Sequence, residues 1–405
     1  MSHRAAIVGG GPAGAMLAYL LASRGIATTL IERQSDFARE FRGEGLSPGG
    51  QLMFREAGLW PEFQALPHTR FDKAGLYFRG RRFASLELSP LGDFAPRWVS
   101  QPAMLEMLVE KSSGFTNFSL LRGAAVAGVR SENGRITGLE IAGGKPMRAD
   151  YVFACDGRLS TLRRGTGLDQ PRNPESFDVV WCKLPMPDFF ADGEAEVRGY
   201  IGNRQLGLFI PSYDGLLQVG WVIPKGSYRK LRDQGIERWL EQIENHVSED
   251  MATHLENNAA ETVRPFLLDV VCDCFDRWST PGMTLLGDAA HPMSPVGAQG
   301  INIALRDAVV AANRFVPLLR DGADGAALDA AARAFRAERI AEVAPIQKLQ
   351  RRGPRILFGN QLLLSGLVWQ VRMLQGLGML GWIGRRFGSG PRSFAYGVTD
   401  VRLKV

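Results

Sequence analysis

The stretch "AAIVGGGPAGAMLAYLLASRGIATTLIER" over residues 5–33 constrains the fold more than any other part of the chain. Its apolar run at residues 5–8 predicts a buried strand, and residues 28–31 predict a second one. Residues 15–24 have the composition of a helix, and a glycine-rich turn at residues 9–14 joins that helix to the first strand. The order strand, turn, helix, strand is that of a βαβ unit, which predicts a parallel sheet in an α/β fold.

The glycines of this turn have the spacing G-x-G-x-x-G, which is typical of dinucleotide-binding turns. Gly9 permits the tight turn, Gly11 lets the backbone approach a pyrophosphate, and Gly14 allows the helix to pack closely on the strand. Pro12 and Ala13 stand at the helix start, where free N–H groups and the positive end of the helix dipole favour an anion. The turn is therefore predicted to bind a dinucleotide.

Glu32 and Arg33 follow the second strand and are included in the predicted binding site. Glu32 lies 18 residues after Gly14, about where dinucleotide-binding folds need a carboxylate for the ribose hydroxyls. The alternative is a purely structural turn, because glycine-rich turns also occur without a ligand. The sequence contains no second unit of this kind, so one dinucleotide has a dedicated fold.

Composition limits the class of protein. The chain has 405 residues, more than one hydrophobic core usually organises, so two lobes are expected. Its 45% hydrophobic and 22% charged residues are ordinary for a globular protein, and a net charge of +6 without a basic stripe argues against a nucleic-acid partner. The four cysteines lack metal-site spacing, so no metal site is expected. The first strand begins too near Met1 for a secretory signal, and we expect a cytoplasmic protein.

A second lobe is predicted from alternating apolar and polar residues at 71–88 and between 171 and 264. In the first lobe, Asn133-Gly134 predicts a hairpin turn, and a charged helix at 326–350 is expected to lie solvated on the outside. The predicted division is a dinucleotide-binding lobe of residues 1–70, 97–170 and 265–350, a sheet lobe of residues 71–96 and 171–264, and a C-terminal helical segment of residues 351–405.

Two further motifs each follow a predicted buried strand. In "ACDGRLSTLRR", Asp156 and Gly157 come directly after the strand, and Ser160 and Arg163 follow at helical spacing. In "LLGDAAHPMSPVGAQGINIALRDA", Asp288 follows a strand and a glycine-rich turn opens the next helix. In their order and spacing, the three motifs resemble the class A flavoprotein monooxygenases, the aromatic monooxygenases of the p-hydroxybenzoate hydroxylase class.

The resemblance covers most of residues 1–315 and implies an FAD-dependent enzyme. It implies an α/β fold in which a Rossmann-like FAD-binding lobe is interleaved with an antiparallel-sheet substrate lobe and followed by a C-terminal helical segment. In this family NADPH or NADH reduces FAD, O2 adds to form a flavin hydroperoxide, and its terminal oxygen passes to an electron-rich substrate. The implied reaction is hydroxylation or epoxidation of a hydrophobic, aromatic small molecule.

The resemblance also assigns the two acidic residues. Asp288 would accept hydrogen bonds from the ribityl chain of FAD, although aspartate also suits a helix N-cap. Asp156 would contact both FAD and the transient NAD(P)H site, with a helix cap as its alternative role.

Other implied contacts surround the flavin ring and the adenine. The segment from Pro295 to Asn302 would lie along the ring, with a helix near its end that points its positive end at the flavin. The predicted contacts of this segment are Pro295, Gly297, Gly300, Ile301 and Asn302. Arg42 would contact the FAD phosphates or a mobile flavin loop, Gln101 would be a polar FAD contact, and Val126 a backbone contact to adenine.

The flavin-borne chemistry needs no protein nucleophile, and the sequence contains no recognisable Ser/His/Asp arrangement. His291 is interpreted as structural or flavin-adjacent rather than as a general base. Trp181, Phe209 and Trp221 would either line the substrate pocket or belong to the core of the sheet lobe, and both interpretations stay open.

Three other functions share parts of this pattern. Flavin-dependent halogenases carry a W-x-W-x-I-P motif, whereas this chain has Val219 in place of the first tryptophan, followed by Trp221. Prenyl-lipid reductases share the glycine fingerprint and use reduced FAD without oxygen. A non-enzymatic FAD-binding scaffold would turn nothing over.

The segment 356–387 is unusually apolar. Its longest stretch without a charge, residues 356–371, has 16 residues, which is shorter than the ~20 that a membrane-spanning helix requires. Flanking arginines would suit a segment that lies on a membrane surface or covers an apolar substrate entrance, and the alternative is a helix pair packed on the FAD lobe. The sequence is compatible with a monomer and with a homodimer.

Overall fold

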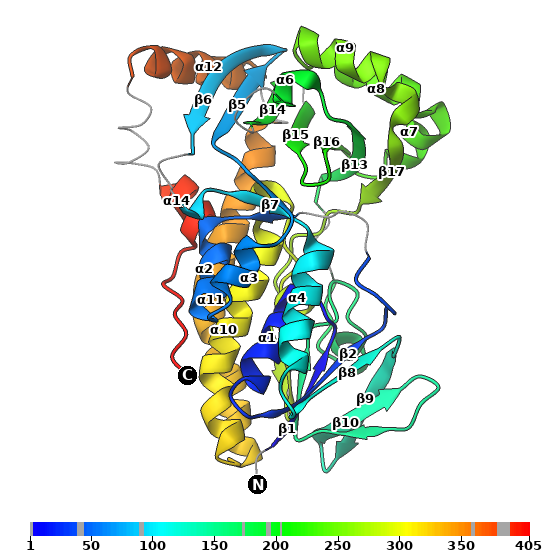
Figure 1. The fold of residues 1–405 in the computed structure, drawn as a ribbon, viewed down its shortest axis with the longest axis vertical. Helices are drawn as coiled ribbons and strands as arrows, with labels where there is room; N and C mark the ends of the chain where they lie inside the picture. Colours follow the sequence, from blue (N-terminus) through cyan, green and yellow to red (C-terminus); the bar gives the residue numbers. More distant parts are fainter. Residues whose placement is uncertain are drawn as a thin grey trace.

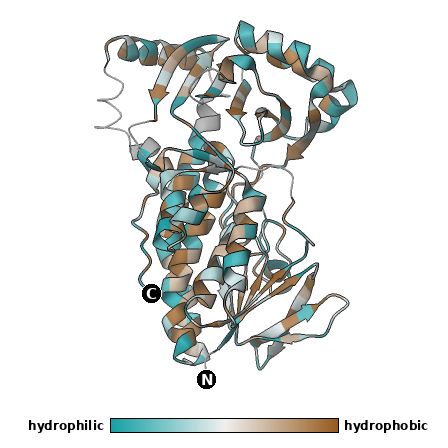
Figure 2. Cartoon of the chain, in the orientation of Figure 1, coloured by the Kyte–Doolittle hydropathy of each residue, from teal (hydrophilic) through white to brown (hydrophobic). Residues whose placement is uncertain are grey.

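The computed structural model describes residues 3–38, 44–88, 93–171, 175–191, 196–202, 205–357, 361–378 and 389–405. Figure 1 shows an elongated molecule with a mainly parallel sheet in its lower part and a second sheet at its upper end. Hydrophobic residues concentrate in the strands of both sheets (Figure 2). The two sheets define a lower and an upper lobe.

The lower sheet has six strands in the order β18-β19-β12-β1-β2-β8. Its neighbours pair in parallel, except that β18 runs antiparallel to β19. The strands are β1 (Arg4–Val8), β2 (Ala27–Glu32), β8 (Phe118–Arg122), β12 (Tyr151–Ala154), β18 (Ser279–Thr280) and β19 (Met283–Leu285). This parallel sheet confirms the α/β fold class.

Three helices, α1 (Pro12–Ala22), α4 (Gln101–Ser113) and α10 (Gln299–Arg320), cover the lower sheet, and α1 packs against the other two. Helix α1 begins three residues before the predicted start because Pro12 fits the first turn, where an N–H group has no intrahelical partner.

A small sheet of β9 (Val126–Glu132), β10 (Arg135–Ile141) and β11 (Met147–Arg148) belongs to the same lobe. Asn133 and Gly134, with φ of 49° and 77°, form the predicted hairpin turn between its first two strands.

The upper sheet has seven strands in the order β17-β13-β16-β15-β14-β5-β6. They are β5 (Lys73–Phe78), β6 (Arg81–Glu87), β13 (Phe177–Pro185), β14 (Glu196–Gly202), β15 (Gln205–Pro211), β16 (Leu216–Pro224) and β17 (Val263–Leu268). Neighbours are antiparallel except β5 and β14, which pair in parallel. Strands from an early segment thus share one sheet with strands from a late one, which is the expected interleaving. The exact lobe boundaries stay a prediction.

Residues on the two faces of the upper sheet alternate along each strand. Phe209 and Trp221 face helices α7 (Tyr228–Gln234), α8 (Ile236–Glu244) and α9 (Glu249–Asn257), and they share one buried cluster with Trp239 of α8. Trp181 belongs to the other face, in a cluster that includes Val296 of the lower lobe.

Shorter elements complete the chain. Strands β3 (Gly45–Leu46), β7 (Arg97–Val99) and β4 (His68–Arg70) form an antiparallel sheet near the junction of the lobes (Figure 1). The helical elements not yet given are α2 (Pro48–Glu56), α3 (Trp60–Gln64), α5 (Thr161–Gly165), α6 (Asp188–Ala191), η2 (Ala259–Glu261), η3 (Gly287–Ala289), η4 (Val296–Ala298), α11 (Gly325–Leu357), α12 (Gln361–Gly376) and α14 (Ser389–Tyr396).

The C-terminal segment contains α12, which lies along β6 of the upper sheet (Figure 1). Ser85 of β6 donates its backbone N–H to Gln375 Oε1 of α12 at 3.0 Å. Within the described ranges, no helix is both long enough and apolar enough to cross a bilayer.

Helix α11 confirms the helix expected at 326–350, but the expectation of a solvated outer helix is wrong. Phe335 and Val343 are fully buried, and so are the charged residues Arg339 and Glu342. The helix packs against α10, so one of its faces is an interior surface rather than a solvated one.

A chain of buried ion pairs joins α10, α11 and the turn after β19. Arg339 Nε donates to Asp307 Oδ1 at 2.6 Å, and the same guanidinium pairs with Glu342. His291 Nε2 donates to Asp307 Oδ2 at 2.7 Å, and Arg306 pairs with Glu342 at 2.6 Å. Burial alone would raise the pKa of Asp307, but His291 and Arg339 outweigh it and lower the pKa to about 2. The contribution of Asp307 to stability is therefore complete above its ordinary pKa of 3.8 and is lost as pH falls through about 2.

Replacing Arg339 should destabilise the fold severely. Arg339→Met keeps most of the side-chain volume but removes the positive partner that Asp307 and Glu342 share, and we expect a loss of about 3–5 kcal/mol in the free energy of unfolding. Chemical denaturation of purified protein measures this change. Arg314→Met removes an ion pair with Glu338 whose arginine side chain is 45% exposed, and should change stability by about 0–1 kcal/mol. Equal effects of the two substitutions would contradict a structural role for the buried network.

Candidate functional site

The three motif turns follow strands that are neighbours in the lower sheet. β1 and β19 both pair in parallel with β12, so the carboxyl ends of the three strands lie at one edge. Gly9 follows β1, Asp156 follows β12, and Asp288 follows β19. A side chain at Gly9 would bring its Cβ to 2.3 Å from the carbonyl oxygen of Cys155, which shows how closely the first two turns pack.

The glycines of the first turn have different reasons for lacking a side chain. Gly9 has φ of 101°, and a Cβ at Gly14 would lie 1.9 Å from the carbonyl oxygen of Gly9. Both glycines are therefore required by the local packing. A Cβ at Gly11 would meet no atom within 4 Å, so the backbone there faces open space at the start of α1. Pro12 and Ala13 form the first residues of that helix, which has no side-chain cap at its N-terminus.

Glu32 lies buried at the end of β2, and two backbone groups orient its carboxylate. Gly10 N–H donates to Oε2 at 2.7 Å, and Gln34 N–H donates to Oε1 at 3.0 Å. The carboxylate thus lies against the glycine turn, where the fingerprint places a ribose contact. Arg33 is the next residue and is exposed.

Asp156 takes the alternative capping role with one oxygen only. Its Oδ2 accepts the backbone N–H of Leu162 in α5 at 3.1 Å, and Ser160 Oγ accepts that of Arg163 at 2.9 Å. The other oxygen, Oδ1, is buried and has no hydrogen-bond partner among the described residues. A buried, unpaired carboxylate oxygen is costly, so it favours a polar ligand at this point.

Asp288 lies inside η3, whose N-cap is Leu286, so the structure does not bear out the N-cap alternative. Its Oδ2 accepts a hydrogen bond from Arg158 Nε at 3.0 Å. Both side chains are 30% exposed, which leaves the carboxylate accessible at the same edge as Asp156.

The loop at residues 295–302 comprises Pro295, η4 and the first residues of α10. Two side chains from the start of α10 hold it in place. Gln299 Nε2 donates to the carbonyl oxygens of Gly297 at 2.7 Å and of Phe394 at 2.9 Å. Asn302 Nδ2 donates to the carbonyl oxygens of Ala298 at 2.6 Å and of Gly45 at 3.1 Å.

The same loop turns through left-handed backbone conformations, with φ of 74° at Gly297 and 51° at Ala298. A Cβ at Gly300 would meet no atom within 4 Å, so the start of α10 faces open space there. Ile301 is the next residue of α10, and Pro295 is the N-cap of η4. The arrangement leaves backbone N–H groups and the positive end of a helix available to a flat, electron-accepting ligand.

The remaining predicted FAD contacts lie at starts of elements. Gln101 is the first residue of α4, and Val126 is the first of β9, close to the end of β2 because Ala124 N–H donates to the carbonyl oxygen of Glu32. Arg42 lies outside the described residues.

The three aromatic residues considered for the substrate pocket lie on different faces of the upper sheet. Phe209 and Trp221 are buried on the face covered by helices, where they pack as core. Trp181 lies on the opposite face in the cluster that contains Val296 of the ring-binding loop. This placement favours the core interpretation for Phe209 and Trp221 and leaves Trp181 as a candidate pocket residue.

His291 belongs to the buried network through one ring nitrogen, since its Nε2 donates to Asp307 and the side chain is 1% exposed. This geometry favours the structural interpretation over that of a general base.

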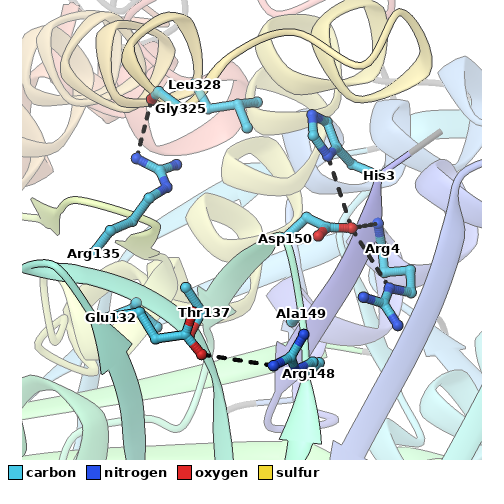
Figure 3. Close-up of a pocket in the computed structure, with 11 residues that line it drawn as sticks. His3, Arg4, Glu132, Arg135, Thr137, Arg148, Ala149, Asp150, Gly325 and Leu328 are labelled. Atoms are coloured by element: carbon cyan, nitrogen blue, oxygen red, sulfur yellow. Dashed lines mark hydrogen bonds and ion pairs between the residues drawn. The ribbon is translucent and has the colours of Figure 1, made fainter. Parts of the chain in front are cut away.

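A cavity of about 260 Å³ lies away from the three motif turns. Figure 3 shows His3, Arg4 and Asp150 on one side and Arg135 with Gly325 on the other. Arg4 begins β1 and Asp150 precedes β12, so this cavity lies at the amino ends of the strands, opposite the edge that carries the motifs. It has no part in the candidate site.

Sequence reasoning missed two residues that shape the site. Gln299 lies within the motif, and its amide carries the hydrogen bonds that fix the loop. Glu44 is buried beside Gly45, at a place where the only sequence signal was an acidic residue between two glycines.

Comparison with known proteins shows the family to which the chain belongs. A family model for an FAD binding domain matches residues 3–344. A 6-methylpretetramide 4-monooxygenase from Streptomyces rimosus is 35% identical over 313 residues, which cover 75% of this chain and 73% of that protein.

Solved structures show the same fold. The p-nitrophenol 4-monooxygenase of Pseudomonas putida DLL-E4 is similar with a TM-score of 0.79 at 18% identity, covering 98% of this chain and 99% of that one. HpxO of Klebsiella pneumoniae complexed with FAD is similar with a TM-score of 0.73 at 20% identity, covering 96% and 100%. The fold, the three motif turns and the family match agree: the chain belongs to the FAD-binding family of class A flavoprotein monooxygenases, and its cofactor is FAD.

Proposed function

We propose that this enzyme uses NADPH or NADH and O2 to hydroxylate a small, hydrophobic aromatic molecule. The observation that carries the proposal is the contact between the loop at residues 295–302 and the apolar face of the upper sheet. Val296 of that loop packs in one cluster with Trp98, Trp181 and Ile210. A cofactor loop against an apolar wall provides a site from which water is excluded, as oxygen transfer requires.

The described residues at the carboxyl edge fit FAD. Gly11 leaves room for the pyrophosphate at the start of α1, and Glu32 would bind the adenosine ribose. The unpartnered Oδ1 of Asp156 and the accessible carboxylate of Asp288 would take hydroxyl groups of the cofactor. When bound, FAD takes electrons from NAD(P)H and activates O2.

The residues of the chain would then bind and orient the flavin ring and shield the reacting atoms from water. Backbone N–H groups of the loop and the N-terminus of α10 supply a positive field beside the ring, and Gly300 leaves space for it. The face of the upper sheet around Trp181 keeps water from the reacting atoms.

Oxygen and reduced nicotinamide should be consumed together. Purified protein reconstituted with FAD and given NADPH or NADH should oxidise the nicotinamide faster when a suitable member of a panel of phenols and polycyclic aromatics is added. Mass spectrometry should find one oxygen atom from 18O2 in the product. Nicotinamide oxidation that proceeds equally well without O2 would contradict a monooxygenase and favour a reductase.

The assignment of Asp288 to the ribityl chain can be tested by cofactor binding. Asp288→Ala removes an acceptor that we expect to bind hydroxyl groups, so the dissociation constant for FAD should rise about 10- to 100-fold. Flavin absorbance after dialysis and a fluorescence titration measure this change. Asp400→Ala, at an aspartate whose side chain is 79% exposed in the C-terminal tail, is the control and should keep full occupancy. A fully yellow Asp288→Ala protein would remove this residue from the site.

We further propose that α12 contacts a membrane surface. Among its residues only Leu364 is buried, while Leu362, Leu363 and Trp369 are 83%, 68% and 65% exposed. Exposed leucines and a tryptophan next to Arg372, on a chain of net charge +6, suit the interface of an anionic bilayer. In the described part of the segment, α12 lies along β6 of the upper sheet and also contacts α11.

Membrane contact predicts binding to vesicles. The protein should co-sediment with vesicles of equal parts phosphatidylcholine and phosphatidylserine, and Leu362→Ser with Trp369→Ser should weaken binding about 100-fold. Leu121→Ser, at a leucine of β8 that is 39% exposed, is the matched control. Self-association of the wild type without any vesicle binding would contradict the proposal and indicate a second copy of the chain as the partner.

A further inference from the structure

Five polar residues gather near the Trp181 face of the upper sheet, and we call them the Glu44 cluster. They are Glu44, Trp98, Lys183, Tyr213 and Gln218. Glu44 is 1% exposed, Gln218 is 0% exposed and Lys183 is 5% exposed, so three strongly polar side chains are buried together with aromatic ones. Neither the family motifs nor the cofactor contacts explain them.

Hydrogen bonds and charge connect the cluster. Tyr213 Oη donates to Glu44 Oε1 at 3.0 Å, and Trp98 Nε1 donates to Gln218 Oε1 at 2.8 Å. Lys183 Nζ lies 5.4 Å from the centre of the Tyr213 ring and donates to Asp214 Oδ2 at 2.5 Å. In the sheet register, Lys183 of β13 lies opposite Gln218 of β16.

The cluster borders the loop that would carry the flavin ring. Gly45 follows Glu44, and a Cβ on it would lie 3.0 Å from Cβ of Ala298 in that loop. Asn302 donates to the carbonyl oxygen of Gly45 at 3.1 Å. Tyr213 also packs against the cluster of apolar residues that contains Val296. The Glu44 cluster therefore lies between the loop at residues 295–302 and the Trp181 face of the upper sheet, where the proposed function places the substrate.

Three buried polar atoms of this region have no hydrogen-bond partner in the part of the chain that the structure describes. They are one acceptor, Glu44 Oε2, and two donors, Gln218 Nε2 and Trp181 Nε1. An unpaired buried polar group destabilises the fold, so such a group is expected to meet a ligand. One acceptor with two donors suits a small molecule that carries a hydroxyl group and a further oxygen.

We propose that Glu44, oriented by Tyr213, accepts the proton of a phenolic hydroxyl group on the substrate, and that Gln218 and Trp181 bind the substrate's oxygen atoms. This inference rests on the proposed function and assigns the residue that would take the proton from a phenolic substrate. In the step, the O–H bond breaks, the electron pair stays on the phenolic oxygen, and the proton moves to Glu44 Oε2. The negative charge on the oxygen raises the electron density of the ring carbons ortho and para to it, which favours attack on an electrophilic oxygen.

The surroundings of Glu44 raise the pKa of its carboxyl group. Burial raises the pKa of Glu44 and the carboxylate of Asp214 adds to that rise, while the positive charge of Lys183 and hydrogen bonds from Tyr213 and from the backbone N–H of Gln101 partly offset it. Burial likewise raises the pKa of Tyr213 to about 12, so Tyr213 keeps its proton and acts as a donor. Since only the carboxylate form accepts a proton, turnover of phenols should fall as pH drops through the raised pKa of Glu44.

The absorbance of a chromogenic phenol shows whether the bound phenol has lost its proton. Wild-type enzyme with bound FAD should bind 4-nitrophenol and show its phenolate absorbance at a pH at which the free phenol is neutral. Glu44→Gln keeps the side-chain shape and should hold the same phenol in its neutral form. The best phenol of the substrate panel is then used to measure kcat. At pH values below the pKa of that phenol, Glu44→Gln should lower kcat about 100-fold, and at pH values above that pKa turnover should recover.

Two further variants separate a proton acceptor from a structural residue. Tyr213→Phe removes a hydrogen bond that lowers the pKa of Glu44, so it should move the acid limb of the pH profile to higher pH. Glu62→Gln, at a glutamate of α3 paired with Lys111, is the control and should leave spectrum and profile unchanged. FAD content and thermal midpoint are recorded for each variant.

Failure of this inference differs from failure of the proposed function. No binding of 4-nitrophenol, a neutral spectrum in the wild type, or the same phenolate spectrum in Glu44→Gln would overturn the role of Glu44. Enzyme that incorporates oxygen into aromatic products with an unchanged acid limb in Glu44→Gln would also overturn it while leaving the monooxygenase assignment intact.

Discussion

Parallel pairing of β1, β12 and β19 is the constraint on which the rest of the site depends. It brings three turns from distant parts of the chain to one edge of a single sheet, with Gly9, Asp156 and Asp288 each within three residues of a strand end. Because backbone hydrogen bonds set the register of these strands, they fix where the polar groups at the strand ends lie, and the hydrogen bond from Arg158 Nε to Asp288 Oδ2 at 3.0 Å adds a side-chain contact between two of the turns. An edge built in this way can hold an extended anionic cofactor along its length.

Buried ion pairs keep the other side of the site in place. Asp307 accepts from His291, from Arg339 and from the backbone N–H of Gly287, so it links the turn after β19 to α10 and α11. Glu342 extends the same network through Arg306 to the C-terminal tail, where Arg306 donates to the carbonyl oxygen of Thr399. A network of this kind is sensitive to the loss of any one partner, which suits a role in positioning rather than in chemistry.

Local patterns in the sequence predicted the features that depend on neighbours in the chain. The glycine turn, the hairpin at Asn133-Gly134 and the FAD family follow from spacing, because backbone geometry at those positions restricts the residue type. The buried face of α11 was missed because arginine and glutamate normally indicate solvent, and only the partners of Arg339 reveal otherwise. Glu44 and Tyr213 are 169 residues apart and meet through the junction of two lobes, so no pattern within either segment signals their contact.

The central claim is that one FAD lies along the carboxyl edge of the lower sheet, with its ring between the loop at residues 295–302 and the Trp181 face of the upper sheet. A crystal structure of the enzyme after reconstitution with FAD tests this claim most directly. The account predicts one FAD per chain, with its pyrophosphate at the N-terminus of α1 beside Gly11 and its ring against residues 295–302. Density for the cofactor anywhere else, or a ring separated from the Trp181 face by polypeptide, would contradict it.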